Sequence, residues 1–191
     1  FILGNHELLD LNGHNIHVRS KYKNLASKLG LNYTKDFIGI NSELGRWLRT
    51  KNSIEKIGDL LFIHAGISQE LLNLELSLKE INQIVRGSVG HLNDPDSISN
   101  IILGKKGPLC DRGMGHNQDS ETAKVIDNSK QYFNVSTLII GHSTVSDICQ
   151  QYQGSLINVD VHFPHNDNDT NRGKGLLIEF ENRFKVDDFG Y

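Results

Sequence analysis

Short apolar runs that stop at a polar or small residue are the clearest structural signal in this chain. Phe1–Leu3, Leu60–Ile63 and Leu138–Ile140 are such runs, and each is followed directly by glycine or histidine. This is the pattern of a buried strand that ends in a loop. From residue 144 onward the pattern alternates as it does in strands. Glu181-Asn182 separates the last two runs, which predicts a hairpin turn there.

A helix is predicted over residues 42–51, where apolar residues recur with helical spacing. Ser42 is the candidate N-cap, because its hydroxyl can accept a hydrogen bond from a free backbone N–H of the first turn. Leu44, Trp47 and Leu48 fall on one face of this helix. We expect Trp47 to anchor that face in the core.

Further helices are predicted over residues 68–89 and 119–135, and the mixed segment 7–30 ends in a glycine, as helices often do. Residues 91–118 are expected to be largely irregular. Helices therefore alternate with strands early in the chain, and the end is rich in strands, which predicts an α/β fold. Since no internal repeat or linker divides the sequence, we expect one domain over residues 1–191.

Polar side chains follow three of the predicted strands where each strand ends. Asn5 and His6 follow the first, His64 the second and His142 the third. If the three strands share one sheet, their carboxyl ends bring these side chains into one cleft. A single histidine at a strand end is usually structural. Imidazole nitrogen and amide oxygen together are ligands for divalent ions such as Mn, Fe and Zn, so the set predicts a metal site.

These residues stand in the motifs "LGNHE", "FIHAGIS" and "IIGHS". In this order the motifs resemble the second half of the calcineurin-like metallophosphoesterase signature. Gly-His-Ser without a second histidine resembles the phosphoprotein phosphatase branch. The stretches "NSELGRWLRTKNSIEKIG" and "GPLCDRGM" are similar to its Shewanella-like bacterial subgroup. The resemblance covers nearly the whole chain and implies a metallophosphoesterase-type β-sandwich flanked by helices (α/β/β/α).

The resemblance also implies a metallophosphatase that hydrolyses phosphate monoesters with two divalent ions (Mn, Fe or Zn). Asn5, His64 and His142 match three ligands of the second ion. His6 matches the general acid that protonates the leaving oxygen, and histidine suits this role because it titrates near neutral pH. Arg112 matches an arginine that clamps the phosphate, for which a guanidinium supplies a bidentate fork.

The sequence departs from this family in lacking the GDxHG and GDxxDRG motifs, which the family carries upstream. In the family these motifs supply the exclusive ligands of the first ion, the carboxylate that bridges both ions, and the aspartate that orients the acid histidine. We therefore expect an N-terminally truncated catalytic domain without its N-terminal strands and with at most one partial metal site. As given, the chain is expected to be a weak catalyst at best, with an exposed sheet edge that makes it prone to aggregate.

Three functions remain open from the sequence. The first is phosphoprotein dephosphorylation, with phosphotyrosine favoured over phosphoserine or phosphothreonine because Shewanella-like relatives include phosphotyrosine enzymes. The second is hydrolysis of dinucleoside polyphosphates. The third is a non-catalytic phosphate-binding domain, because the ligands of the first metal are missing.

Composition narrows the partners further. The net charge of −3 and the pI of about 6.3 give no electrostatic case for binding nucleic acid or an anionic membrane. No apolar run approaches the ~18 residues that a membrane span needs. The expected partner is a phosphorylated protein or peptide, or a small phosphate ester, and the sequence leaves the localisation open.

Overall fold

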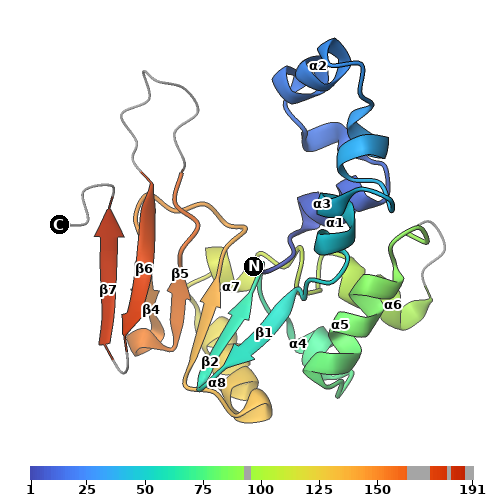
Figure 1. The fold of residues 1–191 in the computed structure, drawn as a ribbon. Helices are drawn as coiled ribbons and strands as arrows, with labels where there is room; N and C mark the ends of the chain where they lie inside the picture. Colours follow the sequence, from blue (N-terminus) through green and yellow to red (C-terminus); the bar gives the residue numbers. More distant parts are fainter. Residues whose placement is uncertain (93–95, 163–172, 180–181, 188–191) are drawn as a thin grey trace.

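A five-stranded mixed sheet forms the centre of the computed structural model, which describes residues 1–92, 96–162, 173–179 and 182–187 (Figure 1). The strand order is β1-β2-β3-β5-β4. The three inner strands are parallel, and the two outer strands pair antiparallel to their neighbours. The strands are β1 (Ile54–Ile57), β2 (Leu60–Ile63), β3 (Thr137–Ile140), β4 (Cys149–Gln151) and β5 (Leu156–Asn158).

A separate antiparallel hairpin packs against one face of this sheet. It consists of β6 (Lys174–Glu179) and β7 (Asn182–Asp187). The alternating strands expected near the end of the chain are therefore confirmed. Asn182 belongs to β7 rather than to the predicted turn, and Glu181 lies outside the described residues.

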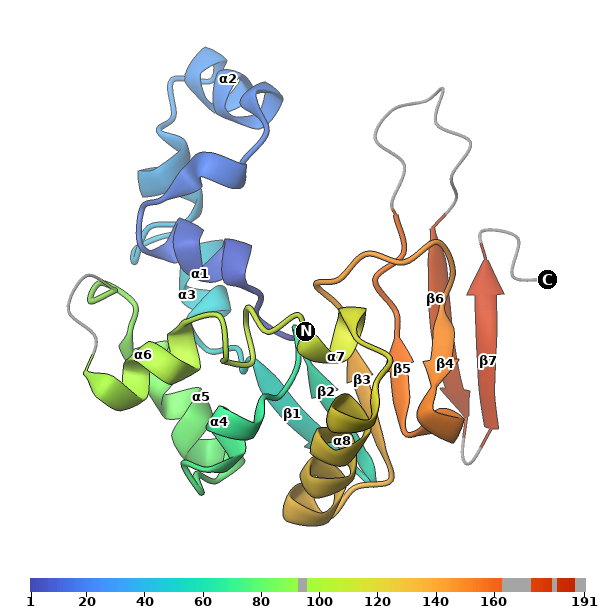
Figure 2. The ribbon, with the colours of Figure 1, turned by 180° about the vertical axis from the view of Figure 1, so that it is seen from behind.

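Helices cover the opposite face of the sheet, with α8 running along β3 (Figure 2). The described helices are α1 (Asn5–Leu11), α2 (Ser20–Lys28), α3 (Glu43–Leu48), α4 (Gln69–Leu72), α5 (Leu78–Gly87), α6 (Ser97–Leu103), α7 (Gly113–His116) and α8 (Ser120–Phe133). Shorter helical turns are η1 (Asn15–His17), η2 (Tyr33–Phe37) and η3 (Tyr152–Gly154). Helices α1 to α3 form an arm that projects from one end of the sheet (Figure 1).

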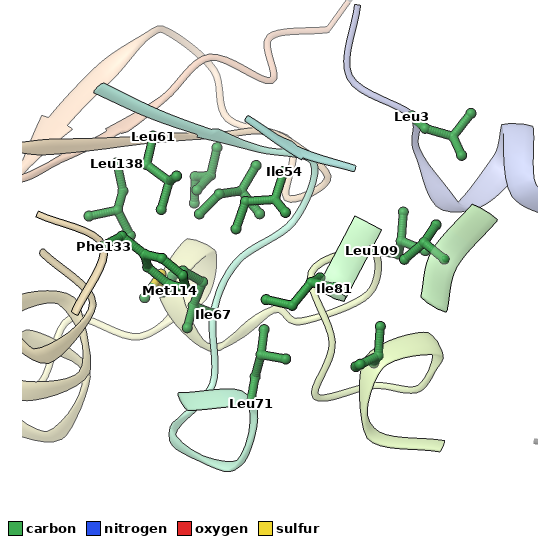
Figure 3. Close-up of a cluster of buried hydrophobic side chains, with 14 of the residues drawn as sticks. Leu3, Ile54, Leu61, Ile67, Leu71, Ile81, Leu109, Met114, Phe133 and Leu138 are labelled. Atoms are coloured by element: carbon green, nitrogen blue, oxygen red, sulfur yellow. The ribbon is translucent and has the colours of Figure 1, made fainter. Parts of the chain in front are cut away.

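Side chains alternate across the sheet and so build two cores. Leu61 and Leu138 join the main cluster on the helix side, where Figure 3 shows them near Phe133 and Met114. Their neighbours Leu60 and Ile139 point the other way and form a smaller cluster against Leu176 and Ile178 of β6. The α/β class predicted from the sequence is confirmed. Among the described residues, no helix covers the outer face of the hairpin, where the predicted α/β/β/α arrangement has its last layer.

The first predicted strand is reduced to a single bridge. Ile2 pairs with Asn52, and the Leu3 N–H donates to the Asn52 carbonyl at 2.8 Å. Leu3 is buried, but Phe1 is 66% exposed. One bridge nevertheless suffices to fix the chain beside β1 just before Asn5.

The predicted helix 42–51 forms as α3, with Ser42 as its N-cap: the Ser42 hydroxyl accepts the Gly45 N–H at 3.0 Å. The expectation that Trp47 anchors the core is wrong. Its side chain is 44% exposed and lies at the surface against the Phe1 ring, with Lys51 over its own ring. The buried face of this short helix consists of Gly45 and Leu48, because the backbone at Gly45 approaches the preceding loop too closely for a larger residue.

Two further expectations need correction. The predicted helix 68–89 is two helices, α4 and α5, because Glu75 adopts a positive φ of 52° and Ser77 caps a new helix in a capping box with Glu80. Residues 91–118, expected to be irregular, contain α6 and α7. Across the described residues, no helix is long and apolar enough to cross a membrane.

Candidate active site

The parallel strands β2 and β3 place two histidines at one edge of the sheet. Ile63 pairs with Ile140, so His64 and His142 leave neighbouring strands at the same level. The Gly141 N–H donates to the His64 carbonyl at 3.0 Å, which holds the two strand exits together. His142 itself has a φ of 64°, in the left-handed region that non-glycine residues seldom occupy. This unusual backbone turns the side chain at the strand end.

Helix α1 brings Asn5 to the same edge. The helix starts directly after Gly4, whose N–H donates to the Glu7 carboxylate at 3.0 Å and so fixes the first turn. The Asn5 Oδ1 atom then lies 3.0 Å from the His64 Nε2 atom. Gly4 is required here, since a Cβ atom at this position would lie 2.7 Å from His64 Cε1.

Asn5, His64 and His142 thus form one cluster, hereafter the amide–imidazole cluster. The His64 and His142 rings lie edge to face, with centroids 5.1 Å apart. The convergence expected from their positions at strand ends is present in the structure, although the three residues are widely separated along the chain.

Burial keeps both imidazoles of the cluster neutral. It lowers the pKa of His64 to about 4, with further lowering from the positive charges that His142, His6 and Arg112 can carry. Burial also lowers the pKa of His142, and Arg112 adds to this effect while the Asp160 carboxylate opposes it. Neutral imidazoles offer a lone pair to a cation at neutral pH.

Arg112 stands immediately beside the cluster. Its Nη1 atom donates to the His142 carbonyl oxygen at 3.1 Å, and the residue is otherwise exposed to solvent. The loop before α7 is held in part by the buried Asp111, whose carboxylate accepts the Met114 N–H at 3.4 Å and whose pKa is raised by burial. The guanidinium therefore has donors free to meet an anion at the cluster.

His6 lies next to the cluster but outside it. It is exposed, and its ring stacks on that of His17, with centroids 3.9 Å apart and an interplanar angle of 5°. Partial burial lowers its pKa, His17 lowers it further, and Glu7 opposes the shift. His6 also contributes to the lowered pKa values of His64 and His142, as its proximity to both requires.

Two residues near the site were not assigned to it from the sequence. Asp160 follows β5, a third parallel strand of the same sheet, and accepts a hydrogen bond from the Thr144 hydroxyl at 3.3 Å. The strand-end rule that identified His64 and His142 also applies to Asp160. His17 had no such signal, because it comes from a turn after α1.

The donor set fits part of a metal site. Two neutral imidazoles and one amide oxygen suit Mn, Fe or Zn, and Gly4 leaves the space that the His64 ring fills. In the parts of the chain that the structure describes, no group of three His, Cys, Asp or Glu side chains is placed to hold a metal ion. The donor atoms of Asn5, His64 and His142 are all neutral, and none of the three residues carries a carboxylate.

Comparison with solved structures relates the chain to protein tyrosine phosphatases. The cold-active protein tyrosine phosphatase of a psychrophilic Shewanella species has a TM-score of 0.75 and 31% identity, over 83% of this chain and 48% of that one. A point mutant of a cold-active protein tyrosine phosphatase gives a TM-score of 0.75 and 31% identity over 84% of this chain. A relationship to phosphatases is therefore established.

A second structure of cold-active protein tyrosine phosphatase, at 1.1 Å, gives a TM-score of 0.75 with 30% identity. The chain spans about half the length of these proteins, with coverage of 47% to 48%. A comparison with protein-family models and another with curated proteins found no match.

Proposed function

We propose that this protein is a metal-dependent phosphatase of the calcineurin-like metallophosphoesterase family, in the Shewanella-like subgroup of its phosphoprotein phosphatase branch. The observation that carries the proposal is the amide–imidazole cluster with Arg112 at its side. The likeness to protein tyrosine phosphatases supports a phosphorylated protein as the substrate class, and phosphotyrosine as its modified residue.

In this proposal Asn5, His64 and His142 hold one divalent ion, and the active protein uses two. When bound, such ions supply Lewis acidity toward phosphate and lower the pKa of water. The low pKa of His64 suits a metal ligand, because at neutral pH the ring does not need to lose a proton before it binds a cation.

Arg112 and His6 provide the remaining functions. The exposed guanidinium of Arg112 offers two parallel N–H donors to phosphate oxygens, and its hydrogen bond to the His142 carbonyl fixes its direction. His6 donates a proton to the leaving oxygen as a water oxygen bonds to phosphorus and the ester bond breaks, so that the alcohol or phenol departs uncharged.

The decisive experiment measures hydrolysis by the full-length protein with three substrates: a phosphotyrosine peptide, para-nitrophenyl phosphate and diadenosine tetraphosphate. We expect EDTA to abolish turnover of the peptide and Mn²⁺ to restore it. Turnover that is unaffected by EDTA, or that is confined to the dinucleotide, would contradict the proposal.

The variant Arg112→Lys tests whether phosphate binding needs the geometry of the guanidinium or only its positive charge. The variant keeps the positive charge but loses the fork, so KM should rise about tenfold, the equivalent of one charge-assisted hydrogen bond. Arg46→Lys, a matched change at an exposed arginine of α3, should leave KM unchanged.

A non-catalytic phosphate-binding domain is the second candidate. It is favoured by the lack of a metal-binding group of three His, Cys, Asp or Glu side chains among the described residues. Calorimetry with inorganic phosphate distinguishes the two functions. Binding that depends on Arg112 in a protein without turnover, even with Mn²⁺, would support this candidate.

A further inference from the structure

We propose that His17 is a positioning residue that holds the ring of His6 in the orientation needed for proton transfer. The inference rests on the proposed function, in which His6 acts as the general acid. Its basis is the parallel contact of the two rings, with centroids 3.9 Å apart and an interplanar angle of 5°.

The backbone after α1 fixes the place of His17. The Asn12 side chain donates to the Leu8 carbonyl at 2.8 Å, Gly13 adopts a φ of 83°, and the His14 N–H donates to the Leu9 carbonyl at 2.9 Å. These contacts turn the chain back along α1. The turn η1 that ends at His17 therefore lies beside the start of the same helix.

A second contact ties this turn to the rest of the arm. The Asn15 side chain donates to the Thr34 hydroxyl at 3.0 Å, which links η1 to the turn η2. Lys23 of α2 lies 3.4 Å from the Asn15 carbonyl oxygen and donates to it. The backbone that carries His17 thus has supports of its own, which do not involve His6.

Stacking suits a positioning role because it uses the faces of the rings. His6 is exposed, and an exposed imidazole normally rotates among several orientations. A ring packed flat against it restricts that rotation but leaves the nitrogen atoms at the ring edge free. His17 therefore orders His6 without occupying the nitrogen that has to donate the proton.

The kinetic test compares two small esters that differ in the quality of the leaving group. Phenyl phosphate needs a proton donor, whereas para-nitrophenyl phosphate has a much better leaving group. In the full-length protein His17→Ala should lower kcat about tenfold on phenyl phosphate and less than about twofold on the nitrophenyl ester, with KM unchanged. His17→Phe keeps a flat ring and should restore most of the loss.

Two controls separate positioning from a general structural role. His14→Ala removes an exposed histidine from the same segment and should change neither rate. In a His6→Ala background, His17→Ala should cost nothing further, because the two residues act as one unit. Equal losses on both esters, or losses that add in the double variant, would overturn the proposal.

An NMR measurement distinguishes failure of this inference from failure of the proposed function. The ring protons of His6 lie over the face of His17, so His17→Ala should move their signals downfield, whereas His14→Ala should not. Unmoved signals overturn the stack whatever the activity. A wild-type protein that hydrolyses neither ester overturns the proposed function and the catalytic role of His17 with it, even where the signals move.

Discussion

At the scale of single residues, His64 has the most strongly shifted histidine pKa among the described residues. It is partly enclosed, it contacts Asn5 and His142, and its pKa is lowered to about 4. This shift has a consequence for stability, because the unfolded chain takes up a proton at this residue at a higher pH than the folded protein does.

We therefore expect the metal-free protein to lose stability as the pH falls through the interval between the two pKa values. The pKa of His64 is about 4 in the folded state against 6.5 for the free residue, so the unfolded state binds more protons in this window. The free energy of unfolding should fall by up to about 3 kcal/mol between about pH 7.5 and pH 4, and should be insensitive to this residue above that range. Urea unfolding at pH 7 and pH 4.5 measures this fall in the free energy of unfolding.

The control for this prediction is His64→Gln, which removes the titrating group. The variant should show a clearly smaller difference between the two pH values. The pKa of Asp147 is lowered from 3.8 to about 2, so this carboxylate stabilises the folded protein until the pH falls below about 4. It therefore does not contribute to the difference between pH 7 and pH 4.5. A wild-type free energy of unfolding that is equal at pH 7 and pH 4.5 would contradict the environment described for His64.

Gly4 provides a second test at the residue scale. A methyl group there would lie 2.7 Å from both Glu7 Oε2 and His64 Cε1. Gly4→Ala should therefore displace one of these side chains, destabilise the protein by about 1–3 kcal/mol and weaken Mn²⁺ binding. Thermal unfolding and metal titration measure the two effects. The matched change Gly87→Ala, at a position with open space around it, should have neither effect.

The residue types of the site could be predicted from the sequence, but their surroundings could not. His64 and His142 follow the ends of adjacent parallel strands, so their proximity followed from the pattern. Asn5 reaches them from the start of α1 after a single bridge, which the pattern did not show. The stack of His6 on His17 depends on how the turn after α1 folds back. The exposure of Trp47 depends on how closely Gly45 packs, and spacing along the sequence does not report that.

At the scale of elements, the short strand β1 shows why tertiary contacts decide weak patterns. Its sequence, Ile-Glu-Lys-Ile, lacks the alternation of a strand, since its two isoleucines are three residues apart, and no strand is predicted there. It forms because it pairs with β2 and because buried Asn82 of α5 binds its backbone. The Asn82 Oδ1 atom accepts the Ser53 N–H at 2.9 Å, and its Nδ2 atom donates to the Ile54 carbonyl at 2.8 Å.

Asn82→Leu should therefore destabilise the protein by about 2–3 kcal/mol, because it removes the partner of three buried backbone groups, the N–H groups of Ser53 and Ile54 and the Ile54 carbonyl. Urea unfolding measures the loss. Gln83→Leu, at the exposed next position of α5, should change the free energy of unfolding by less than about 0.5 kcal/mol. Similar losses in the two variants would show that Asn82 does not link α5 to β1.

The helices that were mispredicted have a related explanation. Helix α6 has the sequence Ser-Ile-Ser-Asn-Ile-Ile-Leu, which is rich in β-branched residues and so gives a weak helical signal. Its N-cap Asp96 and the buried Ile102 hold it in place. The break between α4 and α5 depends on the single positive φ at Glu75, and sequence spacing alone does not signal it.

At the scale of the whole molecule, the sheet separates two hydrophobic cores. One face and the hairpin β6–β7 build a small second core, and the other face and the helices build the main core. Arg183 of β7 ties the layers together, since its guanidinium donates to the Thr137 hydroxyl of β3 at 2.9 Å. The carboxyl edge of the parallel strands is left for the amide–imidazole cluster, where α/β folds commonly bind ligands.

The fold class was predictable because strand and helix periodicities alternate along the chain. The projecting arm, by contrast, is built from short helices, which are joined within the arm by contacts such as the Arg49 guanidinium donating to the Ile38 carbonyl at 2.9 Å. The types of the residues that make such contacts do not indicate which residues will be partners. The arm supplies both Asn5 and His6 to the site, so part of the site geometry was equally hidden from the sequence.

Crystallography of the full-length protein soaked in Mn²⁺, with data collected at the manganese absorption edge, tests the central claim most directly. We predict an anomalous difference peak within bonding distance of Asn5 Oδ1 and of one imidazole nitrogen each from His64 and His142. A saturated crystal with no peak at these three side chains, or with manganese bound only elsewhere, would contradict the account.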